Sequence, residues 1–171
     1  MVGDGGSKPR AGAAPMIALA EGPAFLLVIF LVSLAAAAAV DVWRRQVPNT
    51  AVLAVALSGI GAFAMTGNWE LLWQPLLVAI AIIAVGVPLF ARQWAGGGDI
   101  KLLAASAFWF TAKGALQFVA SVFIAGGVLA LTFLAIRWTQ RGKDSAAASG
   151  GIPYAVAIAI GAAWQVWRYR Y

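Results

Sequence analysis

The sequence contains no cysteine and no histidine among its 171 residues, and only 11% of them are charged. The first two absences exclude disulfide bonds, thiolate metal sites, thiol nucleophiles and imidazole acid–base catalysis. A soluble domain carries about 25% charged residues. Because 63% of this chain is hydrophobic instead, the composition indicates a membrane protein with several spans.

Acidic side chains are especially scarce, with six in all. Four of them lie in tails or in connections between apolar runs: Asp4, Glu21, Glu70 and Asp144. The other two, Asp41 and Asp99, lie inside or beside apolar stretches, where a carboxylate is costly and usually persists because it serves a function. A hydrolase built on this sequence has almost no other candidate catalytic groups.

The twelve basic residues give a net charge of +6 but do not form a patch, which argues against nucleic acid as a partner. They stand mostly between apolar runs, as residues that set topology in a lipid bilayer do. If the first helix runs inward, the cytoplasmic connections hold Arg44, Arg45, Arg92, Lys101, Arg137, Arg141 and Lys143. The outer connections hold only Lys113, although both tails then place basic residues outside. This bias places both aspartates near the cytoplasmic leaflet.

Six apolar segments predict an all-α, polytopic membrane protein, because irregular backbone cannot face lipid. A loose tail is expected at 1–22, a six-helix membrane domain at 23–168 and a short C-terminal tail at 169–171. The helices are expected at 23–43, 49–66, 70–90, 99–112, 114–138 and 151–168. The fourth is short for a hydrocarbon layer of about 30 Å and follows three glycines. We therefore expect Asp99 to lie in a wet recess lined by protein.

Aromatic and small residues support this division of the chain. All eight tryptophans fall near an expected helix end, where an indole ring meets the membrane–water boundary. Glycines occur in the middle of three segments and predict close packing between helices. They are Gly59, Gly61, Gly126, Gly127 and Gly161.

Each aspartate also has a purely structural explanation. Asp99 follows glycines at a helix start, where it can act as an N-cap worth about 1 kcal/mol. Asp41 precedes Arg44 and Arg45 by three and four residues, the spacing of an ion pair on one helix face. Taken together, however, two carboxylates from separate helices at one leaflet suit general acid–base hydrolysis, because a close pair holds one proton and leaves one base.

The residues around the aspartates complete two polar signatures, Asp41-Val-Trp-Arg-Arg-Gln-Val-Pro-Asn49 and Gly96-Gly-Gly-Asp-Ile-Lys-Leu-Leu103. Gly96, Gly97 and Gly98 would let an extended substrate approach the backbone closely. Pro48 and Asn49 are expected to shape the turn into the second helix, with Asn49 capping it. Lys101 is either a basic residue that extends to the membrane surface or a charge that tunes the pair.

These signatures resemble the type IV prepilin peptidase family, also called class III signal peptidases, which are GxGD-type intramembrane aspartyl proteases. The resemblance rests on Asp41, Arg45 and Val47-Pro-Asn49, and on Gly96, Gly98, Asp99 and Lys101 in register. The stretch Gly151-Ile-Pro-Tyr154-Ala155 is similar to the family's last helix, with Ala155 where glycine is commoner.

The resemblance implies a specific activity in a bacterial inner membrane. Such enzymes remove the short basic leader of type IV prepilins and pseudopilins on the cytoplasmic side, just before the substrate's hydrophobic helix. Asp41 and Asp99 would activate water, with no metal, cofactor or covalent intermediate. Larger members carry a cysteine-containing insertion and also methylate the trimmed pilin. This chain lacks that insertion, so we expect a peptidase without methyltransferase activity, similar to the short branch that serves tight-adherence (Flp-type) pili, with archaeal preflagellin peptidases as a neighbouring branch.

Two other functions are compatible with intramembrane acids. A proton- or ion-coupled carrier would use them as relays, and proton-driven uptake lost in Asp99→Asn would identify it. An inactive scaffold for pilus assembly would tolerate asparagine at both positions.

Overall fold

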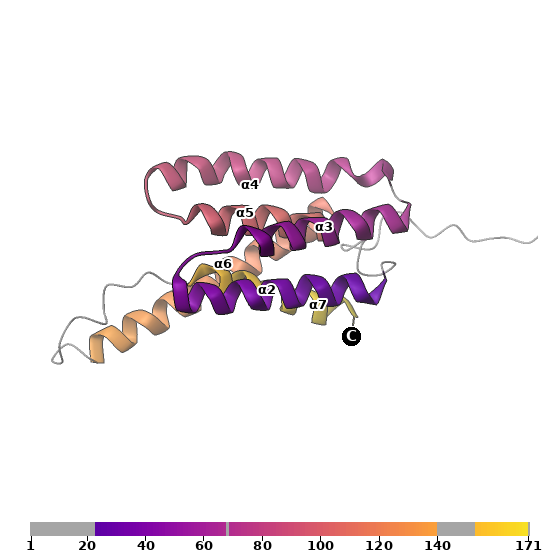
Figure 1. Cartoon of the computed structure of the whole chain (residues 1–171). Coiled ribbons are helices and arrows are strands. Elements are labelled where there is room, and N and C mark those ends of the chain that lie inside the picture. Colours follow the sequence, from indigo (N-terminus) through magenta and orange to yellow (C-terminus); the bar gives the residue numbers. More distant parts are fainter. Residues whose placement is uncertain (1–22, 68, 140–152, 171) are drawn as a thin grey trace, which may run out of the picture.

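The computed structural model describes residues 23–67, 69–139 and 153–170, and that part of the chain contains helices and no strand (Figure 1). The expected N-terminal tail at 1–22 and residue 171 lie outside the described residues. The elements are α2 (Ala24–Arg44), α3 (Asn49–Thr66), η1 (Trp69–Leu71), α4 (Trp73–Ala91), α5 (Gly97–Ser106), η2 (Ala107–Trp109), α6 (Ala112–Thr139) and α7 (Tyr154–Arg170). Their order and bounds confirm the all-α prediction.

Four segments are long and apolar enough to cross a membrane: Ala24–Arg44, Asn49–Thr66, Trp69–Ala91 and Ala112–Ile136. α7 has 17 residues and α5 has only 10. At 1.5 Å per residue, α5 is about 15 Å long and cannot cross the hydrocarbon layer alone. The expected shortness of the fourth helix is therefore confirmed. It begins after extended Gly96 and is followed by a single 3-10 turn that leads to extended Phe110.

The α-helices pack side by side in a ring, in the order α2, α3, α5, α4, α6 and α7. α2 packs on α3 and α7, α3 and α4 pack on α5, and α6 packs on α4 and α7. The end of α2 and the starts of α3, α5 and α7 meet at one end of this ring, on the left in Figure 1. We call it the Asp end, because it holds Asp41 and Asp99, and we call the other the far end.

The interior is filled by aromatic and small side chains. Trp109 is 1% exposed and packs on Phe30 of α2, with ring centroids 4.7 Å apart. The prediction of an interfacial indole is wrong for this residue, because η2 follows the short α5 and brings Trp109 inside the bundle. The seven other tryptophans are exposed, as side chains at a membrane surface would be.

The mid-helix glycines divide into two groups. A Cβ atom at Gly59 would lie 2.8 Å from Cβ of Phe108, and one at Gly161 would lie 2.7 Å from Cγ2 of Val122. Close packing is thus confirmed at both positions. Gly127 differs, because no atom of the described residues lies within 4 Å of its would-be Cβ. The packing prediction is wrong there.

Candidate active site

Asp41 lies in the last turn of α2, where the helix ends at Arg45 in the left-handed conformation with φ of 52°. The Asp41 side chain is 7% exposed, and its Oδ2 accepts a hydrogen bond of 3.2 Å from the backbone N–H of Ala155. Ala155 belongs to the first turn of α7, so the carboxylate meets the positive end of a helix dipole. The side chains of Arg44 and Arg45 are exposed, and the observed partner of Asp41 is α7 rather than the predicted ion pair.

Asp99 is the third residue of α5 and lines a pocket inside the ring. The N-cap of α5 is Gly96, and no side chain caps the helix, so the N-cap explanation of Asp99 is wrong. Its Oδ1 is buried and has no hydrogen-bond partner among the described residues. Asp99 lies near enough to Asp41 for the two carboxyl groups to interact electrostatically. The fold therefore brings two acids 58 positions apart in sequence to one site.

The three glycines before Asp99 are packed against the protein itself. A Cβ atom would come within 2.6 Å of Oδ2 of Asp99 at Gly96, and within 3.2 Å of the Phe90 ring at Gly97. At Gly98 it would lie 2.9 Å from Cβ of Val47. Val47 belongs to the connection that follows Asp41, so the Val47–Gly98 contact ties the two acidic signatures together.

The other predicted site residues lie around this pair. Pro48 is the N-cap of α3, and its carbonyl accepts hydrogen bonds from the backbone N–H groups of Ala51 and Val52, at 3.1 and 3.3 Å. Asn49 is already helical, is exposed and makes no cap hydrogen bond, so its predicted capping role is wrong. Lys101 is exposed two residues after Asp99, on a different face of α5.

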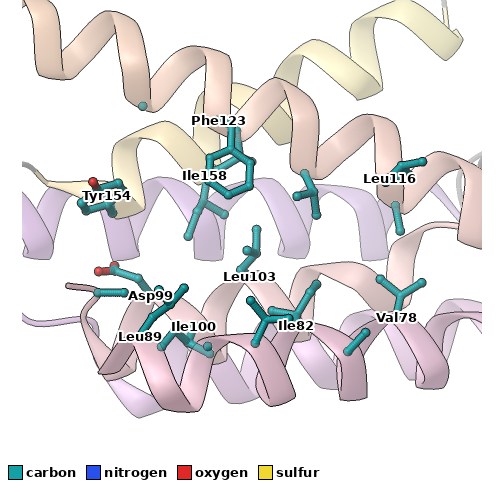
Figure 2. A pocket seen from close by; sticks show the side chains of 18 of the residues that line it. Val78, Ile82, Leu89, Asp99, Ile100, Leu103, Leu116, Phe123, Tyr154 and Ile158 are labelled. Atoms are coloured by element: carbon teal, nitrogen blue, oxygen red, sulfur yellow. The ribbon is translucent and has the colours of Figure 1, made fainter. Parts of the chain in front are cut away.

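A groove of about 720 Å³ begins at Asp99 and runs between α4, α5, α6 and α7. Figure 2 shows Asp99 and Tyr154 at one end of it and Val78 and Leu116 at the other. Apart from Asp99 and Tyr154, its lining residues are apolar or glycine. A carboxyl group therefore stands at the end of a long apolar surface.

The sequence pattern did not identify the start of α7 as part of the site. Ala155 acts through its backbone N–H, which no side-chain motif records. The usable signal was Pro153, since a proline just before a helix marks the turn whose N–H groups remain free for other acceptors.

Comparison with known proteins shows the family of the chain. The family model of the type IV leader peptidase family matches residues 28–131, a stretch that includes both aspartates and the three glycines. The chain belongs to the type IV leader peptidase family. No curated protein and no solved structure matches the chain. The predicted family is confirmed, and this member of it is a membrane protein of a peptidase family.

The match to the leader peptidase family ends within α6 and leaves α7 outside. α7 nevertheless supplies the N–H group that holds Asp41. The structure thus extends the candidate site of this leader peptidase family member beyond the matched residues.

Proposed function

We propose that the protein is a prepilin leader peptidase, an intramembrane aspartyl endopeptidase in which Asp41 and Asp99 are the catalytic residues. The observation that supports this most directly is the pairing of two partly or fully buried carboxyl groups from α2 and α5 beside a groove. In the proposed mechanism the pair shares one proton, since two carboxyl groups close together disfavour double ionisation.

The two aspartates have different roles in the proposed reaction. Asp99 carries the shared proton, because its Oδ1 is buried without a partner and Asp41 is nearby. Asp41, held by the N–H of Ala155, takes a proton from water as the water oxygen bonds to the scissile carbonyl carbon. Asp99 donates its proton to the carbonyl oxygen. When the C–N bond breaks, Asp41 gives its proton to the leaving nitrogen, and a hydroxyl group of the tetrahedral intermediate gives its proton to Asp99 as the new carboxyl product forms, so that Asp99 is again protonated and Asp41 again ionised.

The proposed substrates are type IV prepilins and pseudopilins of the Flp type, cut at the cytoplasmic face of a bacterial inner membrane. The basic residues of the connections support that orientation. Arg44, Arg45, Arg92 and Lys101 are at or near the Asp end, whereas Lys113 is at the start of α6 at the far end. Basic connections remain in the cytoplasm.

The test is co-expression with a pilin-like precursor, followed by mass spectrometry of the new N-terminus. The wild-type protein should remove the leader. Asp41→Asn and Asp99→Asn should each slow cleavage by at least about 10³-fold, since both proton transfers are needed. Glu70→Gln is the matched control, because it removes an exposed acid at the far end. Leader removal at the normal rate by either asparagine variant would falsify the proposal.

A further inference from the structure

The groove beside Asp99 extends along the bundle axis. On α4 its lining residues run from Leu77 to Leu89, about 18 Å at 1.5 Å per residue. This is more than half of a hydrocarbon layer of about 30 Å. At the far end α4 and α6 are joined by a hydrogen bond of 3.1 Å from the backbone N–H of Ala112 to Oε1 of Gln74. This hydrogen bond lies at the far end of the groove, and Asp99 lies at the other.

The rim of the groove is open to the surroundings of the protein. Val85 of α4 is 63% exposed, and Leu116 and Phe123 of α6 are each 73% exposed. In a membrane these side chains face lipid, so their apolar character alone does not distinguish the groove from any other lipid-facing surface. Two further features distinguish the groove from other lipid-facing surfaces.

The first feature is an exposed glycine of α6, Gly127. Small residues in membrane helices usually allow another helix to approach, and Gly161 does so by contacting Val122. Gly127 lines the groove with open space around its would-be Cβ, and the would-be Cβ of Gly126 has only ordinary contacts, at 3.7 Å or more, with Ala157 and Tyr154. Gly126 is buried beside α7, whereas Gly127 is exposed, so α6 offers bare backbone to the groove at Gly127.

The second feature is the position of this part of α6 relative to the two aspartates. A Cβ atom at Gly126 would lie 3.8 Å from the ring of Tyr154, and Ala155, the next residue, donates its N–H to Asp41. Asp99 lines the same groove. A segment that filled the groove at Gly127 would therefore run toward Asp99 and toward the first turn of α7, which holds Asp41.

We infer that this groove, defined by α4, α5, α6 and α7, is where the apolar transmembrane helix of the substrate docks, with its backbone against Gly127. This rests on the proposed function, in which the scissile amide lies just before that helix. The occupant is a helix rather than a lipid chain, because close approach to bare backbone serves helix packing. In the proposed function the carboxyl pair at the end of the groove acts on a peptide bond, which a helical substrate supplies and a lipid chain does not.

The first experiment fills the groove without touching the carboxyl pair. Gly127→Leu places a side chain in open space, so the protein should fold normally. Cleavage of a pilin-like precursor in proteoliposomes should show at least a 10-fold rise in KM with kcat within 2-fold. The matched control is Ala120→Leu, because Ala120 is exposed on α6 and does not line the groove. Its KM should be unchanged.

The second experiment asks what occupies the groove. A photoreactive phenylalanine analogue replaces Leu116 on the rim in an Asp99→Asn background, which retains uncut precursor. The expected product is a crosslink to the apolar helix of the precursor. The same analogue at Leu57, which is 58% exposed on α3, should give crosslinks to lipid alone.

The outcomes separate this inference from the proposed function. If the wild-type protein removes no leader, the proposed function fails. If the wild type cleaves and Gly127→Leu cleaves with the same KM, or position 116 captures only lipid, the groove is a lipid site and the inference is overturned.

Discussion

The two sides of the bundle differ in how much surface they bury within the chain. In α2 and α3, 33% of the span is buried, against 17% in the span that contains α4 and 11% in α6. α2 packs directly on α3 and α7, whereas the groove lies between α4 and α6. We call the first group, α2, α3 and α7, the packed side, and α4 and α6 the open side.

Each side contributes something different to the site. The packed side supplies Asp41 and the N–H group of Ala155 that holds it. The open side supplies the groove that leads to Asp99, and α5, which carries Asp99, packs against helices of both sides. In the proposed function, the packed side holds one acid through a backbone hydrogen bond and the open side gives the substrate a path to the other.

The largest expected effect distinguishes the two sides by stability. Phe30 on the packed side is fully buried against Trp109, and Phe30→Ala should lower the free energy of unfolding by about 3–5 kcal/mol. Phe123 on the open side is 73% exposed, and Phe123→Ala should leave stability unchanged. Thermal unfolding in detergent measures both. Equal losses would mean that the open side is packed in solution.

A smaller effect should appear where α5 meets the connection after Asp41. Gly98→Ala would push a Cβ atom to 2.9 Å from Cβ of Val47 and so move Asp99 relative to Asp41. Misplacement of reacting groups by about 1 Å can cost about 10²-fold, so leader cleavage should fall by roughly that factor. The fall should be mainly in kcat, because Gly98 itself does not line the groove.

The control for this contact is a compensating variant. Val47→Gly removes the Cβ atom that a side chain at position 98 would meet, and the double variant Gly98→Ala/Val47→Gly should recover cleavage to within about tenfold of the wild type. If the double variant is as slow as Gly98→Ala alone, the contact does not position the pair.

Much of this structure could be predicted from the sequence. Apolar runs and their interruptions give the six helices, since the bilayer leaves helices as the available spanning structure for such runs. The scarcity of acids singles out Asp41 and Asp99 before any fold is known. Periodic and compositional signals of this kind describe one segment at a time.

What the sequence could not provide depends on contacts between segments. The bond from Ala155 to Asp41 joins residues 114 positions apart through a backbone group, which any residue except proline possesses. The predictions that Trp109 lies at the membrane surface and that Gly127 packs against another helix were wrong for the same reason. An indole near a helix end can lie inside or outside, and a mid-helix glycine can be covered or bare. Only the packing of the other helices decides which.

The smallest expected effect tests that last distinction directly. Gly161→Ala should lower stability by about 1–3 kcal/mol, because its Cβ atom would lie 2.7 Å from Cγ2 and 3.1 Å from the backbone nitrogen of Val122, which cannot move easily. Gly127→Ala should leave stability unchanged or slightly raise it, since alanine favours helix and nothing is displaced. Unfolding of the two variants in the same detergent compares them. A loss of equal size at Gly127 would show that another part of the chain covers the groove, and would remove the difference between the packed and open sides.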